Sequence, residues 1–256
     1  MKTTHWKLTT VALALGLLGA SGAAQASLSW ALNSGNDDNA TPPTFNEAGG
    51  GYKVTISGWT ENENDGDKLI DVSNRLSLSA DRIILDQVGE DPPNHAFDND
   101  ATGGNKGREM ALAVFEQSTI LTMVDWAYTL ESTGSNGTGS TSNRLDFEVW
   151  YYDGAGTPDV AGKTYGGLLL DGWKILGEYN DVGTGDYLLG NAEKESTHWI
   201  VMTALDGGNN KEFDYGKLRE LGGEKGGGGG PQVPVPAPLL LMGLGLPLIR
   251  LARRSR

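Results

Sequence analysis

Short runs of alternating apolar and polar residues, separated by turn-forming residues, recur along this chain. The segments Tyr52–Ser57 and Leu145–Tyr152 are the clearest examples. In the first of them, Tyr52, Val54 and Ile56 would share one face of a strand, because successive side chains of a strand point to opposite faces. The 38 glycines of the chain favour the tight turns that connect such strands. The pattern predicts an all-β protein.

Further segments rich in β-branched and aromatic residues predict additional strands. They are Leu28–Leu32, Arg82–Asp86, Met110–Glu116, Ile120–Thr129, Trp173–Tyr179 and His198–Leu205, and residues 213–221 fit a last strand or a short helix. A series of short strands joined by glycine-rich and serine-rich turns is typical of an antiparallel β-sandwich, and we expect a jelly-roll-like one. Residues 27–221 are long enough for one such domain with a single hydrophobic core.

The first 26 residues have the layout of a signal peptide. Lysines precede the apolar run Val11–Leu18, and Ala24 and Ala26 form the small-x-small pattern that signal peptidase recognises. We expect signal peptidase to remove residues 1–26, which would be helical before cleavage, and to leave Ser27 as the first residue. The chain is therefore predicted to be exported.

The C-terminal end of the chain is also divided into parts. The glycine-rich residues 222–232 predict a flexible linker, because glycine retains the most backbone freedom. A proline-rich run follows, then the apolar segment Leu239–Ile249, and arginines end the chain. The apolar segment predicts a helix that spans a bilayer only with the help of its flanks. Its arginines favour the cytoplasmic side, so the exported body would be anchored transiently at the inner membrane.

The proline-rich run consists of Val233, Pro234, Val235, Pro236, Ala237 and Pro238. Together with the apolar segment and the final arginines, it resembles the PEP-CTERM sorting signal of Gram-negative bacteria. The resemblance covers residues 233–256 and implies cleavage at this run by an exosortase, a membrane protease. The usual motif reads Val-Pro-Glu-Pro, and Val235 stands here in the acidic position. An ordinary C-terminal membrane anchor is the alternative interpretation of the same layout.

The densest polar motif of the body ends at Asn99. Its candidate site residues are Pro93, Asn94, His95, Asp98 and Asn99. Asp and Asn side chains beside prolines commonly cap turns, so a structural role is the first interpretation. The second interpretation is an ion site, because carboxylate and amide oxygens are ligands that calcium accepts.

The same motif resembles a family of exosortase-dependent surface proteins whose body carries the sequence Pro-Asn-His-Ala-x-Asp-Asn. The match runs from Pro93 to Asn99, and Leu168–Asn180 and Ser196–Ile200 resemble two further segments of that family. The stretch Gly103–Met110 departs from the family, which tends to have a shorter approach to its next strand. The resemblance implies a location at the cell surface or in the extracellular matrix of a biofilm. It implies no chemistry for particular residues.

An acidic loop, Glu61–Asp67, begins like a calcium-binding EF-hand loop. Val72 stands where such a loop needs a bidentate acid, so we expect a solvated acidic loop instead. The sequence therefore assigns no cofactor and no metal, and it leaves calcium as the alternative.

Charge and cysteine content exclude several classes of protein. The chain has no cysteine, and hence no disulfide and no thiolate site. Without the two lysines of the predicted signal peptide and the four arginines of the tail, 14 basic residues face 33 acidic ones, a net charge of −19. Such a surface repels phosphate backbones, which argues against nucleic acid as a partner.

The body contains no recognised catalytic template, and we expect a protein that is not an enzyme. Two alternatives involve carbohydrate. Trp59 and Trp150, if they face outward, would stack on the sugar rings of an exopolysaccharide. Asp146 and Glu148, two residues apart on one strand face, would form the carboxylate pair of a polysaccharide hydrolase.

The sequence thus predicts an exported, exosortase-sorted bacterial protein with a non-catalytic, acidic β-sandwich body. Its processing partners would be signal peptidase and the exosortase, with exopolysaccharide as a possible ligand. The protein would pass through the inner membrane, be anchored there transiently by its tail, and end at the cell surface or outside the cell.

Overall fold

The structure is a computed structural model that describes residues 27–35, 41–62, 65–73, 76–79, 82–85, 96–99, 107–134, 138–190, 193–204 and 213–227. Within these ranges the only helix is α1 (Tyr165–Leu170), and the other regular elements are antiparallel strands. The prediction of an all-β, antiparallel sandwich is confirmed. The predicted signal peptide, residues 1–26, and the predicted sorting signal, residues 233–256, lie outside the described residues.

Fourteen strands make up the sheet. In chain order they are β1 (Ser27–Ala31), β2 (Thr44–Asn46), β3 (Lys53–Asn62), β4 (Lys68–Asp71), β5 (Leu76–Leu78), β6 (Ile83–Leu85), β7 (Phe97–Asp98), β8 (Glu109–Gly134), β9 (Thr138–Ser142), β10 (Leu145–Tyr152), β11 (Trp173–Val182), β12 (Gly185–Leu188), β13 (Glu195–Thr203) and β14 (Phe213–Lys225). The predicted strand at residues 145–152 coincides with β10, and residues 213–221 belong to a strand rather than to a helix.

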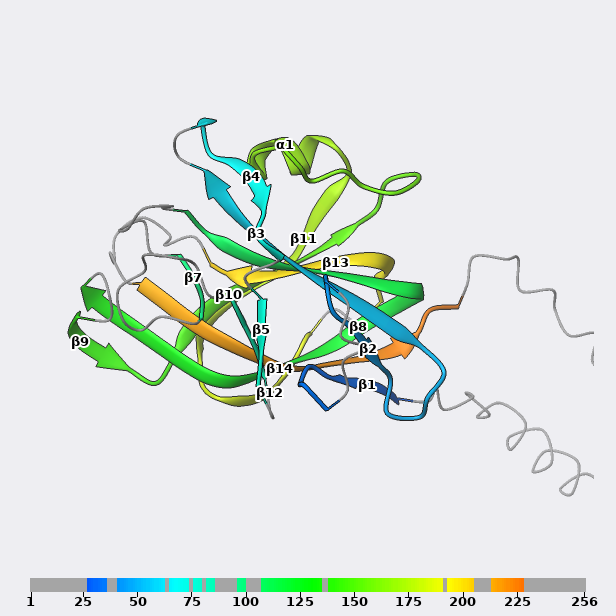
Figure 1. The fold of residues 1–256 in the computed structure, drawn as a ribbon, viewed down its shortest axis with the longest axis horizontal. Helices are drawn as coiled ribbons and strands as arrows, with labels where there is room; N and C mark the ends of the chain where they lie inside the picture. The colour runs from blue at the N-terminus through cyan, green and yellow to red at the C-terminus, as the bar shows by residue number, and fades with distance from the viewer. Residues whose placement is uncertain are drawn as a thin grey trace, which may run out of the picture.

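Strand β8 belongs to both layers of the sandwich (Figure 1). Its first part pairs with β3 and β13, in a layer completed by β4, β10 and β11. Its second part pairs with β14, β12 and β9. On one edge of β8 the partner changes from β3, which pairs as far as Phe115, to β14, which pairs from Thr119, while β13 on the other edge pairs as far as Ile120. The two strands predicted here, Met110–Glu116 and Ile120–Thr129, form one strand because no glycine or proline interrupts them.

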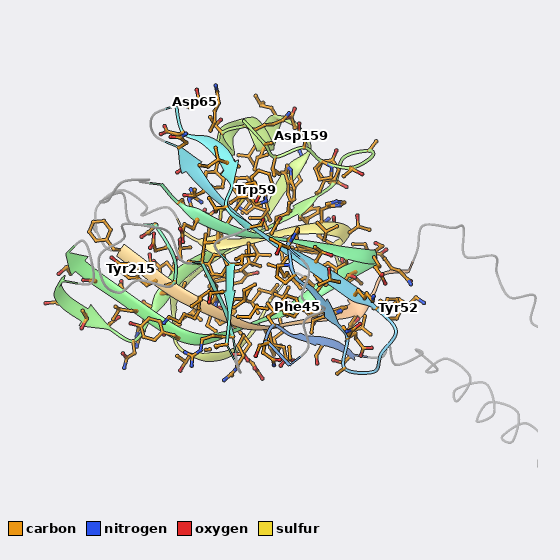
Figure 2. All side chains as sticks on the ribbon, in the orientation of Figure 1. Phe45, Tyr52, Trp59, Asp65, Asp159 and Tyr215 are labelled. Carbon is orange, nitrogen blue, oxygen red and sulfur yellow. The ribbon has the colours of Figure 1, made fainter. Side chains whose placement is uncertain are left out.

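The main hydrophobic core lies between the two layers. Trp30 of β1 packs edge-on against Phe115 of β8, with ring centroids 4.8 Å apart. Trp126 of β8 packs in the same way against Phe147 of β10, at 5.6 Å. Phe45 of β2 lies in this core as well (Figure 2). Burial of each phenylalanine of this kind contributes about 1.5–3 kcal/mol before conformational entropy is counted.

A second core lies on the outer face of the layer that contains β3, β8, β13 and β10. The connection between β10 and β11, residues 153–172, folds back over this face and includes α1 (Figure 1). We call these residues the cover. Val160, Tyr165 and Leu168 of the cover join Trp150 and Ile200 of the strands in one buried cluster, the second core. Strand β10 is therefore buried on both faces, a feature that the sequence analysis did not predict.

The last strand is longer than the sequence analysis predicted. It runs to Lys225, so the predicted domain end at residue 221 and the start of the predicted linker 222–232 are wrong. Gly223 packs so closely that a Cβ atom there would lie 2.8 Å from the carbonyl oxygen of Ile120. These first glycines thus permit close contact between strands, whereas the sequence analysis assigned them to a flexible segment. Residues 228–232 of the predicted linker lie outside the described ranges.

Pairing between β1 and β14 brings the two ends of the described chain together. Ser27 lies opposite Glu224, and Ala31 lies opposite Glu220. The Gly226 amide continues the contact by donating to the Ser118 carbonyl oxygen at 2.9 Å. The chain therefore enters and leaves the sandwich at the same end. Among the residues that the structure describes, no helix has the length and apolar character needed to cross a bilayer.

Candidate functional site

Two of the five candidate motif residues, Asp98 and Asn99, lie in the described part of the chain, while Pro93, Asn94 and His95 lie outside it. Asp98 is buried and ends β7, which pairs with β14. The Asn99 amide nitrogen donates to the Ala204 carbonyl oxygen at 2.9 Å and to the Asp214 carboxylate at 3.1 Å. The Asn99 side-chain oxygen accepts from the Asp214 backbone N–H at 2.8 Å. Asn99 therefore connects the segment after β7 to the ends of β13 and β14.

Asp214 is the buried centre of this connection. Its carboxylate also accepts a hydrogen bond from the Asp146 backbone N–H at 2.8 Å. Burial raises the pKa of Asp214 to about 8, and the nearby carboxylates of Asp146 and Glu131 act in the same direction, while the two hydrogen bonds oppose the shift. Both Asp214 oxygens accept hydrogen bonds from within the protein, one from Asn99 and one from the Asp146 N–H. This geometry supports the structural interpretation of Asn99.

The acidic loop predicted at Glu61–Asp67 is partly strand, because β3 runs to Asn62 and β4 begins at Lys68. Asp65, near the end of this hairpin, forms an exposed ion pair with Lys68 at 3.0 Å (Figure 2). Across the described ranges, no group of three or more His, Asp or Glu side chains is arranged to hold a metal ion.

The second core contains a buried ion pair. The Arg108 guanidinium donates to the Glu148 carboxylate at 3.3 Å, and the two side chains are 2% and 7% exposed. The other Glu148 oxygen accepts from the indole N–H of Trp150 at 2.7 Å. The Arg108 guanidinium also contacts the sulfur atom of Met202 at 3.3 Å. A charged group is thus held among apolar side chains, where electrostatic interactions are stronger than in water.

Tyr165, on α1, covers this ion pair. The Arg108 guanidinium carbon lies 4.4 Å from the centroid of the Tyr165 ring, in cation–π geometry. The Tyr165 hydroxyl donates to the Arg108 carbonyl oxygen at 3.1 Å. Its ring also packs against Trp150, with centroids 6.0 Å apart. Burial raises the pKa of the Tyr165 hydroxyl far above its ordinary value, so this group remains a neutral donor.

The backbone around Arg108 is fixed from the opposite side by β3. The Arg108 backbone N–H donates to the Glu61 carboxylate at 3.1 Å, and the Glu61 N–H donates to the Arg108 carbonyl oxygen at 3.4 Å. A Cβ atom at Gly107 would lie 2.4 Å from the Cβ of Glu61. The absence of a side chain at Gly107 therefore allows this segment to approach β3. Glu61 makes a structural contact there, whereas we expected it to be fully solvated.

The carboxylates considered for a hydrolase have separate surroundings. Glu148 is buried in the ion pair, and the Asp146 side chain accepts from the Asp181 backbone N–H at 2.6 Å. The described structure therefore does not present them as an exposed pair on one strand face.

The expectation that Trp150 faces outward is wrong, because the cover buries it to 3% exposure. Trp59 is half-buried on β3, and its indole N–H donates to the Ser57 hydroxyl at 2.9 Å (Figure 2). The alternation of residues along β10 placed Trp150 on the face opposite the main core, which we expected to be exposed. That face is covered as well, by the second core.

Sequence reasoning did not identify Arg108 or Tyr165. One signal was present: three successive apolar residues, Leu168–Leu170, follow a tyrosine and two glycines in a segment assigned no strand. Of this run only Leu168 is buried, while Leu169 and Leu170 are exposed, so the signal was weak.

Comparisons of the chain with protein-family models, with curated proteins and with solved structures found no match.

Proposed function

We propose that this protein is an exported bacterial surface or extracellular-matrix protein, sorted by an exosortase through its C-terminal signal. Its acidic β-sandwich serves as a non-catalytic structural or adhesive body. Signal peptidase and the exosortase process the chain at its two ends, and the tail anchors the body transiently in the inner membrane.

The observation that carries the proposal is the pairing of β1 with β14. Ser27, the first residue after the predicted signal peptide, lies opposite Glu224, close to the predicted sorting signal. The first and last strands of the described chain, from which the two predicted processing segments continue, therefore lie side by side. This arrangement supports a body that remains intact when either segment is removed.

The segment between the sandwich and the predicted cleavage motif is short. The Gly227 N–H donates to the Glu195 carboxylate at 3.0 Å, so only the segment between Gly227 and Val233 separates the ordered body from the cleavage motif. An extended chain reaches at most about 3.3–3.6 Å per residue. Cleavage would therefore take place close to the folded body.

The test is expression of the full chain in a Gram-negative host that contains an exosortase, followed by mass spectrometry of the mature C-terminus. We expect a C-terminus within Val233–Pro238, the absence of Leu239–Ile249, and release of the body to the surface or medium. A variant that lacks residues 233–238 should remain in the membrane fraction.

Two controls sharpen this test. Val235→Glu restores the usual acidic position and should be processed at least as completely as the wild type. In a host without exosortase, both forms should retain the tail. If the wild type and the deletion variant fractionate identically in the exosortase host, the sorting proposal is overturned.

A further inference from the structure

The cover is a loop whose two ends are joined. Its ends are joined where Tyr152 pairs with Trp173 and where the Asp153 N–H donates to the Gly172 carbonyl oxygen at 3.0 Å. Gly172 has a φ of +101°, and a Cβ atom there would lie 3.1 Å from the Gly154 Cα. The two ends of the cover therefore need glycine at residue 172, where the backbone is left-handed and close to Gly154. An opening of the cover beyond these ends would leave the pairing of β10 with β11 intact.

The cover is held to the sheet by backbone hydrogen bonds along one side and by the buried contacts of Tyr165. Leu69 of β4 exchanges two backbone hydrogen bonds with the cover, to the Lys163 carbonyl oxygen at 2.8 Å and from the Gly162 N–H at 2.9 Å. The opposite side of α1 exposes Leu169 and Leu170, the latter at 89%. Of the cover's side chains, Val160, Tyr165 and Leu168 are the buried ones in the second core, so an opening of the cover would have to expose these three.

Tyr165 makes three contacts beneath the cover, and a sugar could replace two of them directly, the hydrogen bond to a backbone oxygen and the packing against Trp150, while a sugar hydroxyl could accept from the Arg108 guanidinium in place of the cation–π contact. Its ring lies over the Arg108 guanidinium, its edge meets Trp150, and its hydroxyl donates to a backbone carbonyl oxygen. Aromatic rings beside a few fixed polar groups are typical of binding sites for small polar molecules. When the cover lifts, Tyr165 leaves all of these partners together.

A hydrogen-bond donor in this region lacks an acceptor. Within the described part of the chain, the buried Arg108 Nε has no hydrogen-bond partner, and the same holds for the indole N–H of Trp173. The indole N–H of Trp126 in the main core is also unpaired. An unpaired indole therefore does not distinguish the second core, whereas the unpaired guanidinium nitrogen of Arg108 does. A buried donor without a partner costs about 1–3 kcal/mol, and a ligand oxygen would remove that cost.

We propose that the sheet face beneath the cover is a binding site for a neutral saccharide, which the protein keeps closed with its own Tyr165. Trp150 supplies the apolar surface for a sugar ring, and Arg108 with Glu148 supplies hydrogen-bond donors and acceptors. The ligand replaces Tyr165 when the cover opens. This inference does not depend on exosortase sorting, because it concerns the body alone.

Charge selects a neutral ligand over an acidic one. The positive charge of Arg108 is already balanced by Glu148 at 3.3 Å, and Glu61 lies against the Arg108 backbone. An anionic sugar would meet these carboxylates without a free cation, and like charges at a site disfavour binding.

The test is calorimetric titration of the purified full chain and of Tyr165→Ala with cellotetraose, maltotetraose and mannotetraose, and with tetragalacturonate as the acidic probe. Tyr165→Ala should bind at least one neutral probe about tenfold or more tightly than the wild type, because binding to the wild type must also displace the tyrosine. Tetragalacturonate should bind neither protein. Adding Trp150→Leu to Tyr165→Ala should abolish the binding.

Tyr187→Ala is the matched control. Tyr187 is a half-buried tyrosine packed on the main core, with its ring 5.1 Å from that of Tyr179, and its loss should leave saccharide binding as in the wild type. If Tyr165→Ala folds, as judged by circular dichroism, and binds none of the neutral probes better than the wild type, the proposal is overturned. Preferential binding of tetragalacturonate would overturn it as well.

Hydrogen exchange on the wild type tests the opening even if Tyr165→Ala does not fold. The hydrogen-bonded amides of Gly162, Leu168 and Asp171 should exchange through a local opening that is faster than the exchange of β10 and insensitive to low denaturant. Tyr165→Phe, which loses one hydrogen bond, should speed this exchange by up to about tenfold. Exchange of these amides only by global unfolding would contradict the proposal.

Discussion

At the residue scale, the second core is organised around one buried ion pair. Removing a carboxylate or a guanidinium from water costs several kcal/mol per ion. Arg108 and Glu148 offset this cost through their mutual contact, and Trp150 and Tyr165 add a hydrogen bond and a cation–π contact. If either charged residue is removed, the other remains buried without its oppositely charged partner.

The variants Arg108→Met and Glu148→Leu should therefore each lower the free energy of unfolding by about 3–5 kcal/mol. The double variant should lose less than either single variant, because two apolar side chains of similar volume replace both charges. Urea denaturation of the four proteins measures these differences. A double variant that loses the sum of the two single losses would show that the charges act independently, contrary to this account.

Asp214 provides a prediction about pH. Its folded-state pKa of about 8 lies above the ordinary value of 3.8, so the unfolded chain loses this proton at lower pH than the folded chain. The contribution of Asp214 to stability is therefore present at acid pH, falls as the pH rises from about 4 to about 8, and remains lost above that range.

Asp214→Asn cannot ionise and should lack this part of the pH dependence. Urea denaturation between pH 5 and pH 9 should show the wild type losing stability relative to Asp214→Asn as the pH rises, by up to a few kcal/mol. The comparison cancels the other titrating groups, such as His198, whose pKa burial lowers. A difference between the two proteins that is constant with pH would refute the assignment.

At the element scale, the glycines of β14 set the distance between strands. A Cβ atom at Gly223 would lie 2.8 Å from the Ile120 carbonyl oxygen and 3.4 Å from the Trp30 ring. Backbone cannot move as easily as the end of a side chain, so any larger residue at this position displaces β8 or β1.

Gly223→Ala should lower the free energy of unfolding by about 1–3 kcal/mol through this overpacking. Gly51→Ala is the control, because Gly51 has open space around its Cβ position, and its effect should be small. Thermal unfolding by calorimetry compares the two variants. Equal effects at both positions would mean that β14 does not pack against β8 as described.

The sequence predicted elements well where one face of a strand is buried. Alternation placed β3 near Tyr52–Ser57 and located both ends of β10. It failed where tertiary contacts override the local pattern. Trp150 alternates as an outward residue but is buried by the cover, and Gly222–Lys225 has the composition of a linker but lies in a strand.

The candidate site was predictable only in part. Asp98 and Asn99 stood out because their residue types commonly cap turns, and Asn99 does connect strand ends in the structure. Arg108 and Tyr165 meet across a large separation in sequence, and no local pattern encodes such a contact. Their pairing depends on the loop between β10 and β11 folding back over the sheet.

At the scale of the whole molecule, the folded domain continues beyond residue 221, because β14 runs to Lys225 and Gly227 contacts Glu195. A chain that ends after residue 227 should unfold at the same temperature as the chain with residues 228–232 retained. A chain that ends after Leu221 loses the part of β14 that pairs with Ser27–Ser29 of β1 on one side and with residues 119–123 of β8 on the other. Because each backbone hydrogen bond contributes about 0.5–1.5 kcal/mol, this chain should be less stable by several kcal/mol.

Differential scanning calorimetry of the chains that end after Leu221 and after Gly227 locates the end of the domain. Equal melting temperatures would place the end of the domain at the earlier position and would restore the longer linker.

The pairing of β1 with β14 also determines when the domain can be completed. Among the described strands, β1 is synthesised first and β14 last, so Trp30 acquires its final neighbours only after the other strands exist. Pairings between residues so distant in sequence form slowly. If the chain is exported as we propose, the sandwich would close only after Lys225 has followed the rest of the body across the membrane.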